Sequence, residues 1–380
     1  MIERGGVGVN ASIIGESPTG LGLYAIHLVR ALDTVRSDLC VYTSWPEALA
    51  GLRARVRPAP VAARPERGLR GHLTRLVWVQ TALRRRARAA RLGVLLNTVP
   101  EAVLSAPIPQ VTVVHDVLPL FYPAEYPRQQ YYFRCLLPRV LRRSRLVVAD
   151  SASTRLDLIE RCGLPPAKIR TIYPGYDPTA FYPNGVEAGP GGLPYVLYVG
   201  NLLPHKNLLC LLEALAVLRH RQAARLIIRG AGRPAYVRAL RQRVEALGLG
   251  GLVTLEGYVD EAALRALYTH AACLVLPSLR EGFGLPVLEA MACGTPVVTS
   301  DASSLPEAGG DAALRVDPRD AVGLADAMHR VLADRDLRAD LRDRGLKWVG
   351  AFSWRRTACE MSRVLDEVRG PGPTGMGYTT

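Results

Sequence analysis

The sequence predicts an α/β protein with two doubly wound, Rossmann-like domains of parallel sheet that face a central cleft. Two observations support this fold class. Short runs rich in β-branched residues alternate with longer amphipathic stretches, as they do when helices connect parallel strands. A stretch rich in glycine and proline, "YPNGVEAGPGGLP" (182–194), separates two such series and indicates a domain boundary. A length of 380 residues also favours two cores over one.

Five strands are expected in each half. They are residues 7–15, 39–44, 93–98, 110–116 and 145–150, then 194–200, 224–230, 252–257, 273–278 and 296–300. Helices are expected between them, among others at 207–219 and 262–271. The domain boundaries that follow are an N-terminal domain at 1–182, a linker at 183–194 and a C-terminal domain at 195–352. A helix at 353–368 is expected to cross back to the N-terminal domain, and the tail 369–380 to be disordered.

The composition is that of a globular protein, with 49% hydrophobic and 22% charged residues. The 7 cysteines are scattered and form no CxxC pair, so neither a disulfide framework nor a zinc site is expected and a reducing compartment is. The chain shows no signal-peptide pattern and no apolar run long enough to span a membrane. We therefore expect a cytoplasmic protein.

The positive charge lies mostly in the first half. Of the formal net charge of +14, residues 1–190 carry +11, from 25 Lys and Arg against 14 Asp and Glu. Such a surface favours an anionic partner, namely a membrane surface, a lipid phosphate or nucleic acid. A solvated arginine-rich surface is the alternative, and the two readings stay open.

The stretch 64–93 concentrates this charge, with nine arginines and one glutamate. Apolar or neutral residues recur in it at helical spacing, beside Trp78: Leu69, Leu73, Leu76, Val77, Gln80 and Leu83. A basic amphipathic helix suits an anionic membrane, with Arg84, Arg85, Arg86 and Arg88 as contacts. The alternative is a helix packed on the first sheet with its arginines in water. Nucleic acid is disfavoured because aromatic residues do not alternate with the basic ones.

The stretch "REGFGLPVLEAMACGTPVV" (280–298) reads as a loop between a strand and a helix. Gly282 and Gly284 let backbone N–H groups approach a ligand, and the N-terminus of the helix favours a phosphate. Carboxylates suit hydroxyl groups instead. Glu289 could therefore reach a ribose diol and Glu281 a sugar. A plain strand–turn–helix with two surface glutamates is the alternative.

The E-x7-E run of this stretch resembles the signature of the GT-B retaining glycosyltransferases of family 4. The resemblance extends over roughly 7–360. It includes "TGLGLYAIHLVRAL", "VVHDVLPLFYP", "DSASTRLDLIE", "LYVGNLLPHKNLLCLLEAL", "LIIRGAG", "LEGYVDEAALRALYTHAACLVLPS" and "SSLPEAGGDAALRVDP". It is closest to the mannosyltransferase-like group 1 branch, which builds O-antigen and related polysaccharides.

The resemblance implies transfer of a hexose such as mannose from a GDP- or UDP-sugar, with retention, to a hydroxyl of a glycan or polyprenyl-linked acceptor. It implies no cofactor and no metal. The C-terminal domain would bind the donor and the N-terminal domain the acceptor. The expected location is the cytoplasm, with a peripheral position on the inner face of the cell membrane if the basic helix contacts lipid.

The resemblance also assigns roles to residues. Glu281 would hold the donor sugar, Glu289 the ribose and Lys206 the diphosphate. The backbone of Gly282, Phe283, Gly284 and Leu285 would meet the phosphates, and Tyr258 and Val259 would border the base. Gly20 and Gly22, expected in a loop after the first strand, would let the first domain close on the diphosphate. His115 and Asp116 would face the sugar and the acceptor.

The sequence departs from the family at Asn201, where many members carry an arginine that shares the diphosphate with the lysine. Two weaker patterns are discounted. "TGLGLYA" matches a dinucleotide fingerprint, but no acidic residue ends the second strand, which disfavours an NAD-dependent oxidoreductase. "DRD" (334–336) lies among alternating charges typical of a solvated helix, which disfavours a metal site. A GT-B sugar-nucleotide epimerase stays open as an alternative.

Overall fold

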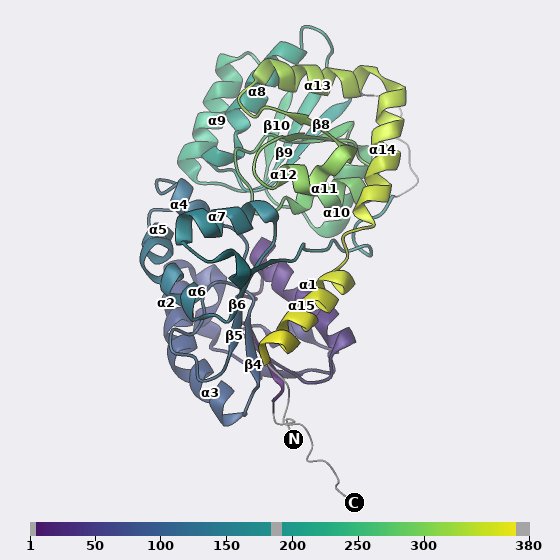
Figure 1. Cartoon of the computed structure of the whole chain (residues 1–380). Coiled ribbons are helices and arrows are strands. Elements are labelled where there is room, and N and C mark those ends of the chain that lie inside the picture. The colour runs from purple at the N-terminus through teal and green to yellow at the C-terminus, as the bar shows by residue number, and fades with distance from the viewer. Residues whose placement is uncertain (1–4, 184–191, 370–380) are drawn as a thin grey trace, which may run out of the picture. The chain divides into compact units, whose positions relative to one another are not determined.

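The computed structural model describes residues 5–183 and 192–369 and divides into two compact units (Figure 1). The first unit runs to Gly175 and also includes the chain from Trp354 onward; the second is Tyr176–Ser353. Each unit contains one parallel sheet with helices around it. No helix in the two described ranges is long and apolar enough to cross a membrane.

The sheet of the first unit is entirely parallel, in the order β3-β2-β1-β4-β5-β6-β7. Its strands are β1 (Val7–Ala11), β2 (Leu39–Thr43), β3 (Arg55–Pro58), β4 (Val94–Asn97), β5 (Gln110–Val114), β6 (Leu146–Ala149) and β7 (Ile169–Thr171). Its helices are α1 (Gly20–Val35), α2 (Gly68–Trp78), α3 (Arg84–Ala89), α4 (Leu118–Phe121), α5 (Gln129–Tyr131), α6 (Leu137–Arg143), α7 (Ala152–Cys162) and α15 (Trp354–Arg369). π-helical turns at Val79–Leu83 and Tyr132–Leu136 join α2 to α3 and α5 to α6.

The sheet of the second unit is also parallel, in the order β10-β9-β8-β11-β12-β13. Its strands are β8 (Tyr195–Val199), β9 (Arg225–Arg229), β10 (Val253–Glu256), β11 (Cys273–Leu276), β12 (Val297–Ser300) and β13 (Ala313–Val316). Its helices are α8 (Leu208–Leu218), α9 (Pro234–Ala246), α10 (Glu261–His270), α11 (Leu285–Ala292), α12 (Leu305–Gly309), α13 (Ala321–Ala333) and α14 (Arg335–Val349).

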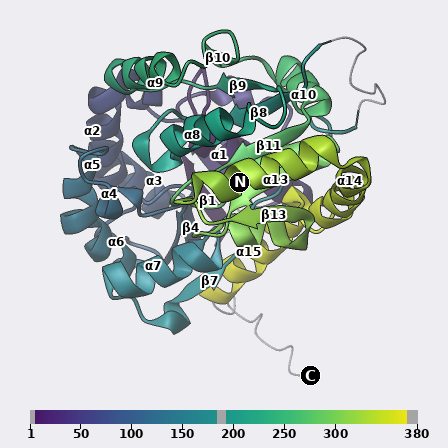
Figure 2. The same cartoon turned by 90° about the horizontal axis from the view of Figure 1, so that it is seen from above.

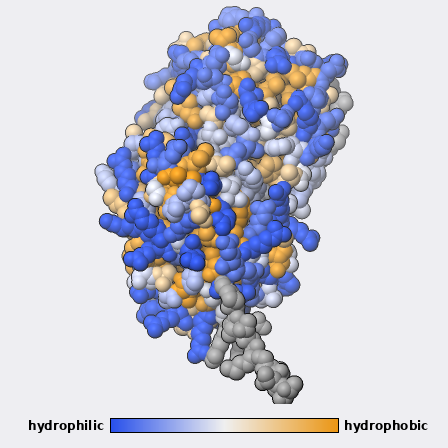
Figure 3. Space-filling view, viewed as in Figure 1, coloured by the Kyte–Doolittle hydropathy of each residue, from blue (hydrophilic) through white to orange (hydrophobic). Residues whose placement is uncertain are grey.

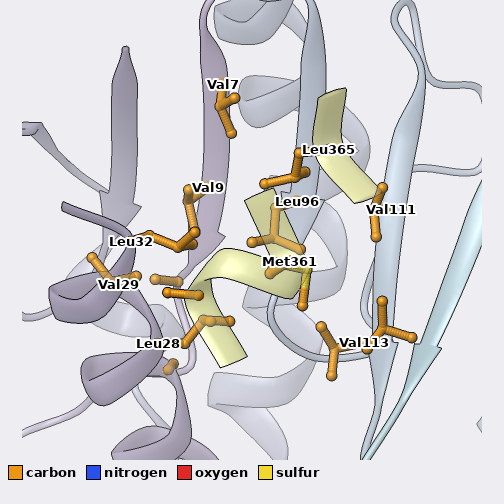
Figure 4. Close-up of a cluster of buried hydrophobic side chains, with 14 of the residues drawn as sticks. Val7, Val9, Leu28, Val29, Leu32, Leu96, Val111, Val113, Met361 and Leu365 are labelled. Atoms are coloured by element: carbon orange, nitrogen blue, oxygen red, sulfur yellow. The ribbon is translucent and has the colours of Figure 1, made fainter. Parts of the chain in front are cut away.

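The core of the first unit joins the two ends of the chain (Figure 4). Val9 of β1 and Leu96 of β4 pack with Leu32 of α1 and with Met361 and Leu365 of α15, and all are fully buried. Helix α15, expected at 353–368, lies against α1 and belongs to this unit. Its apolar face is therefore a structural part of the first core.

The second unit has its own core beneath α8 and α13, which lie side by side in the view of Figure 2. Leu211 and Leu215 of α8 and Met328 of α13 are almost completely buried there. Helix α8 is apolar nearly all round, so both its sheet side and its α13 side are covered.

In the structure the first unit ends at Gly175, whereas the first domain was expected to end at residue 182. Ala180 and Phe181 are buried in the second unit, where the Phe181 ring lies 5.9 Å from that of Tyr268. Tyr176 also forms a parallel bridge with Ser353 of the same unit. Most of the expected linker, and the tail from 370, lie outside the described residues.

All ten expected strands are present, but three strands were not predicted: β3, β7 and β13. Each lies at an edge of its sheet or runs only a few residues, and each exposes part of its surface. Strand β3, "RVRP", carries two arginines and a proline. An edge strand needs only one apolar face, so its sequence lacks the continuous apolar run of a central strand.

Both strand orders reverse at one point, next to β1 and β4 in the first sheet and next to β8 and β11 in the second. Loops that leave the carboxyl ends of the two strands at such a point diverge to opposite faces of the sheet. Ligands of open α/β sheets bind in the crevice that this leaves. The loops after β8 and β11 are therefore where the second unit is expected to hold a ligand.

Candidate functional site

Lys206 and Glu281 meet at the switch point of the second sheet. Lys206 follows β8 and Glu281 follows β11, and the Lys206 Nζ lies 2.7 and 2.6 Å from the two Glu281 carboxylate oxygens. Both side chains are largely buried, with 15% and 10% of their surface exposed. The fold thus brings together two of the residues assigned to the donor.

Serine side chains fix the loop that carries Glu281. Ser278 Oγ donates to Glu281 Oε1 at 2.7 Å. Ser303 Oγ donates to the Glu281 carbonyl at 2.9 Å, and Ser304 Oγ lies 3.1 Å from that carbonyl and 3.0 Å from the Phe283 carbonyl. Ser303 and Ser304 come from the loop after β12 and fix the backbone of the Glu281 loop, whereas Ser278 and Lys206 hold the carboxylate itself.

Lys206 sits in a single 3-10 turn, Pro204–Lys206, before α8. Asn207 ends this turn in the left-handed conformation, with φ 62°, which asparagine tolerates better than most residues. Its amide donates to the carbonyls of Pro277 and Pro318 at 3.1 and 2.5 Å. Asn207 thereby ties the Lys206 turn to the end of β11.

Helix α11 starts directly after the Glu281 loop. Gly284 precedes it with φ 109°, and a Cβ there would lie 2.8 Å from a Leu305 methyl group, so both conformation and space require glycine. Phe283 is buried against the Phe352 ring, at 5.8 Å between centroids. The two residues anchor the start of the helix, where backbone N–H groups and the dipole favour an anion.

Glu289 lies on α11, where its Oε2 accepts a hydrogen bond from the Tyr268 hydroxyl at 2.9 Å. Burial raises the pKa of Glu289 to about 7, although the Tyr268 hydrogen bond opposes the shift. The carboxyl group therefore holds its proton to a higher pH than an exposed glutamate does.

Asn201, Tyr258 and Val259 lie at the same edge of the second sheet. Asn201 follows β8, and the other two residues follow β10. The Tyr258 hydroxyl donates to Asn201 Oδ1, and the Tyr258 side chain is largely exposed. Asn201, which departs from the family pattern, is thus held by Tyr258, which the resemblance assigns to the nucleotide base.

In the first unit, His115 follows β5 and is held by both ring nitrogens. Nδ1 lies 2.6 Å from Asp150 Oδ2, and Nε2 lies 2.8 Å from the Thr98 carbonyl. Both partners are acceptors, an arrangement satisfied only when both nitrogens carry protons. Burial lowers the pKa of His115, but the Asp150 charge and hydrogen bond and the Thr98 carbonyl outweigh it and raise the pKa overall.

Aromatic rings surround this histidine. The Tyr24 ring meets His115 edge to face at 4.5 Å and Trp354 at 5.3 Å, and Trp354 stacks on His27 at 5.3 Å. Asp116 Oδ1 accepts from the Leu118 backbone N–H at 3.0 Å at the start of α4. His115 is thus a packed group whose position is fixed by protein partners at both ring nitrogens.

Gly20 and Gly22 lie inside the first turn of α1, not in the expected loop. A Cβ at Gly20 would meet no atom within 4 Å, whereas at Gly22 it would come within 2.9 Å of Pro18. Thr19 before them supplies no side-chain cap, so its hydroxyl leaves the backbone N–H groups of this helix start unoccupied by the N-cap residue.

The basic stretch 64–93 is a helix whose arginines do not all face water. Arg75 is buried and forms two hydrogen bonds to the Glu101 carboxylate, Nε to Oε2 at 2.6 Å and an NH2 group to Oε1 at 2.9 Å. His72 Nδ1 lies 2.7 Å from the same carboxylate. Burial raises the pKa of Glu101, but His72 and Arg75 more than compensate and lower it to about 2.

The expected apolar stripe of this helix divides between two faces. Leu83 is fully buried with Trp78 in the core, whereas Leu69, Leu73 and Val77 of α2 are exposed at 44%, 51% and 63%. Arg84, Arg85, Arg86 and Arg88 of α3 are exposed as well, and Arg86 donates to the Pro58 carbonyl at 2.7 Å. Elsewhere on the first unit, too, hydrophobic residues interrupt a hydrophilic surface, as the one face seen in Figure 3 shows.

The "DRD" stretch begins helix α14, where the Asp334 carboxylate caps the helix by accepting from the Leu337 backbone N–H at 2.9 Å. No group of three His, Cys, Asp or Glu side chains suited to a metal occurs within residues 5–183 and 192–369.

Sequence reasoning did not single out Ser278, Ser303, Ser304, Tyr268 or Asp150, all of which bond to assigned residues. Asp150 and Ser278 had a signal of their own, since each ends a predicted strand, 145–150 and 273–278, as His115 and Asp116 end the strand predicted at 110–116.

Two sheets in Rossmann order, with a lysine–glutamate pair and a helix start at the switch point of the second, are the features of a GT-B glycosyltransferase. Two family models match the chain: "Glycosyltransferase Family 4" over residues 18–180 and "Glycosyl transferases group 1" over 186–348. The protein therefore belongs to the family 4 glycosyltransferases, whose two domains these models describe.

Curated relatives cover part of the chain. The O-antigen chain mannosyltransferase B of Escherichia coli is 34% identical over 64% of this chain and 66% of its own length. RfbU, an O-antigen chain mannosyltransferase of Salmonella typhimurium, is 34% identical over 56% and 57%. A D-inositol 3-phosphate glycosyltransferase of Corynebacterium jeikeium is 32% identical over 60% and 59%. The alignments thus span between 57% and 66% of the length of these relatives.

Solved structures share the fold over nearly the whole chain. The sucrose-phosphate synthase of Thermosynechococcus elongatus has a TM-score of 0.78 at 24% identity and covers 95% of this chain and 98% of its own. WaaG, a glycosyltransferase involved in lipopolysaccharide biosynthesis, has a TM-score of 0.69 at 17% identity and covers 96% and 100%. At these identities the likeness concerns the fold.

Proposed function

We propose that the protein transfers a hexosyl group from a nucleotide diphosphate sugar to a hydroxyl of a glycan or lipid-linked acceptor, with retention of anomeric configuration. The observation that carries this proposal is the Lys206–Glu281 pair beside the start of α11. It combines a cation for a diphosphate with a carboxylate for sugar hydroxyls at the edge where an open α/β sheet binds its ligand.

The second unit would bind the donor. Lys206 and the N-terminus of α11 would neutralise the diphosphate, Glu281 would hold the sugar and Glu289 the ribose. Asn201, Tyr258, Val259, Gly282, Phe283, Gly284 and Leu285 would line the nucleotide. Asn201 cannot supply the second cation of related enzymes, so Lys206 and the helix dipole would carry the charge.

The first unit would bind the acceptor at the carboxyl edge of its sheet, where His115 and Asp116 lie, and Gly20 and Gly22 would admit the diphosphate to the start of α1. In the reaction, the acceptor oxygen bonds to the anomeric carbon while that carbon's bond to the phosphate oxygen breaks. The diphosphate leaves with the electron pair and takes up the acceptor's proton. Stabilising its charge would be the main catalytic contribution, and no metal ion is required.

The names of two relatives, both O-antigen chain mannosyltransferases, favour a mannosyl donor and a polysaccharide-building role. A lipid-linked acceptor would be reached from the inner face of the cell membrane, with α2 and α3 as the contact. A cytoplasmic location is part of the same proposal.

The test is a thermal-shift panel of GDP-, UDP- and dTDP-sugars, followed by product analysis with and without a glycan acceptor, in buffer with EDTA. Stabilisation by one donor and acceptor-dependent release of its nucleoside diphosphate would support transfer. Conversion of the donor sugar without an acceptor would indicate an epimerase instead, and activity that is lost in EDTA and restored by Mn²⁺ would contradict the metal-free mechanism.

A further inference from the structure

The first unit has a hollow at the edge of its sheet where β5, β6 and β7 begin, with a volume of about 960 Å³. Three segments that lead into these strands form its walls, 104–109, 142–145 and 165–170, and the end of α15 closes one side. We call it the basic groove. It lies at the amino ends of the strands, whereas His115 and Asp116 follow the carboxyl end of β5. The basic groove is therefore distinct from the acceptor edge.

The basic groove carries a large excess of positive charge. Five cationic side chains line it, against one carboxylate, that of Glu367: Arg142, Arg143, Arg145, Lys168 and Arg170. Arg170 pairs with Glu367 at 3.0 Å. Within the part of the chain that the structure describes, the other four form no ion pair. A net charge of about +4 thus faces one hollow without a protein counter-charge.

Lys168 lies close to two of the arginines of the basic groove. It is one of three lysines in the chain, is half-buried, and donates from Nζ to the Arg142 carbonyl at 2.5 Å. Burial, and secondly the charge of Arg145, lower its pKa below the usual range. The ammonium group is therefore partly desolvated beside a like charge, an arrangement that a bound anion would relieve.

A solvated surface accounts for only part of the cluster. Arg142 and Arg143 lie in the last turn of α6, where cations offset the helix dipole. Arg145 and Arg170 lie before and within strands, and no helix end explains them. They come from different chain segments and converge on one hollow, which a solvated arginine-rich surface does not explain.

We propose that the basic groove binds an anion carrying two or more phosphate groups, either free in solution or displayed by a lipid headgroup. Guanidinium groups bind phosphate oxygens in a planar, bidentate geometry. The five cations come from two segments of the wall, 142–145 and 165–170, so that one phosphate could not meet them all, whereas a chain of phosphates could. This site goes beyond the proposed sugar transfer and does not depend on it.

The experiment is calorimetric titration of the full-length protein with inorganic tripolyphosphate. The groove variant replaces Arg142, Arg145 and Arg170 with glutamine. A matched variant replaces three exposed arginines of the second unit: Arg238, Arg241 and Arg335. At the groove we expect one tripolyphosphate per wild-type protein and a loss of about tenfold in affinity for each groove arginine replaced, which corresponds to the loss of one hydrogen bond to a charged group. The matched variant, with the same change in net charge, should bind like the wild type.

A Lys206→Gln variant separates this site from the donor site, and its affinity for the tripolyphosphate bound at the groove should equal that of the wild type. Absence of binding to the wild type would overturn the proposal. Equal weakening in both arginine variants, or loss of binding in Lys206→Gln alone, would also overturn it.

Vesicles distinguish the two sources of phosphate. Sedimentation with phosphatidylinositol bisphosphate in phosphatidylcholine vesicles, if reduced in the groove variant only, would identify a headgroup. Tripolyphosphate binding without groove-dependent sedimentation would identify a free anion, and both results support the site.

Discussion

The ammonium group of Lys206 lies within 2.7 Å of both carboxylate oxygens of Glu281, although 75 residues separate them in the chain. The contact follows from strand order, because β8 and β11 are neighbours and their carboxyl ends open side by side. Glu281 thus orients the cation that would meet the diphosphate, and Lys206 holds the carboxylate that would meet the sugar. Each residue should depend on the other.

The first prediction concerns this coupling. Glu281→Gln should reduce turnover at saturating donor by about ten- to a hundredfold, because a charged hydrogen bond contributes ~1.5–3 kcal/mol, and should change nucleoside diphosphate affinity less. Lys206→Met should weaken nucleoside diphosphate affinity. In the double variant the losses should be less than additive, because each single change already breaks the pair. Steady-state kinetics and calorimetry measure both quantities, and fully additive losses would show that the two side chains act independently.

The second prediction concerns Glu289, whose pKa burial raises to about 7. A carboxyl group with a raised pKa in the folded state contributes stability that is fully present below its unfolded pKa and is lost as pH rises through the folded pKa. Between about pH 5 and pH 8 the free energy of unfolding should therefore fall by about 2 kcal/mol from this group. Denaturant unfolding across this range measures it.

Glu289→Gln should remove that fall, so that the variant resembles the wild type at pH 5 and exceeds it at pH 8. Tyr268→Phe is the matched control. It deletes the hydrogen bond that favours the charged form, so it should make the pH dependence steeper. A wild-type protein with the same stability at both pH values would contradict the prediction.

The third prediction is that His115 carries a proton on both ring nitrogens at neutral pH, because Asp150 and the Thr98 carbonyl both accept from it. Nitrogen-15 NMR of the imidazole ring should show two protonated nitrogens at pH 7. Asp150→Asn removes the negative charge and should lower the pKa of His115, so that one nitrogen loses its proton. A single protonated nitrogen in the wild type at pH 6 would be the opposite result.

The sequence predicted the central strands and the glutamate loop because both follow from short-range patterns. A buried parallel strand is an apolar run, and "REGFGLP" is a local turn before a helix. The edge strands β3, β7 and β13 were missed, because one-sided burial leaves only weak patterns. Ser303 and Ser304 were missed because they reach Glu281 only through tertiary folding, 22 and 23 residues along the chain.

The basic helix also has a feature that depends on tertiary contacts and that its sequence did not predict. Charge and periodicity predicted its existence and its amphipathic character, but not which face packs. Arg75 reads as one more surface arginine, yet it is buried because Glu101 lies beside it in the fold.

The fourth prediction concerns this buried pair. The pKa of Glu101 is lowered from 4.5 to about 2, with burial opposing the shift and His72 and Arg75 overcoming it. A lowered carboxyl pKa contributes stability that is present above the unfolded pKa and lost as pH falls through the folded one. About 3 kcal/mol should therefore be lost between about pH 4.5 and pH 2.

Arg75→Met should leave Glu101 buried without its main partner and cost about 3–5 kcal/mol at pH 7, the usual effect of breaking a buried ion pair. Arg75→Met combined with Glu101→Leu should recover much of that loss, because no charge then remains buried. Denaturant unfolding at pH 7 measures both variants. If the single and double variants were equally unstable, loss of packing rather than an unpaired charge would be the cause.

The last prediction is that α2 and α3 bind an anionic membrane surface. Leu69, Leu73 and Val77 occur every four residues and are exposed along one side of α2, and a continuous helix places such residues in a row. The exposed arginines of α3 follow on the same helical segment. Apolar side chains that enter the headgroup region and arginines that attract anionic lipid, at ~1 kcal/mol each, are the two components of reversible binding.

Wild-type protein should therefore sediment with phosphatidylglycerol vesicles but not with phosphatidylcholine vesicles, and less at high salt. Replacing Arg84, Arg85 and Arg88 with glutamine should abolish sedimentation at every salt concentration; Arg86 is kept because it bonds to Pro58. Replacing Leu69, Leu73 and Val77 with serine should leave only weak, salt-sensitive binding, since the electrostatic part remains. Donor affinity should be unchanged in both variants. If the wild type ignores anionic vesicles at low salt, these side chains are a solvated face and the acceptor is not reached through a membrane.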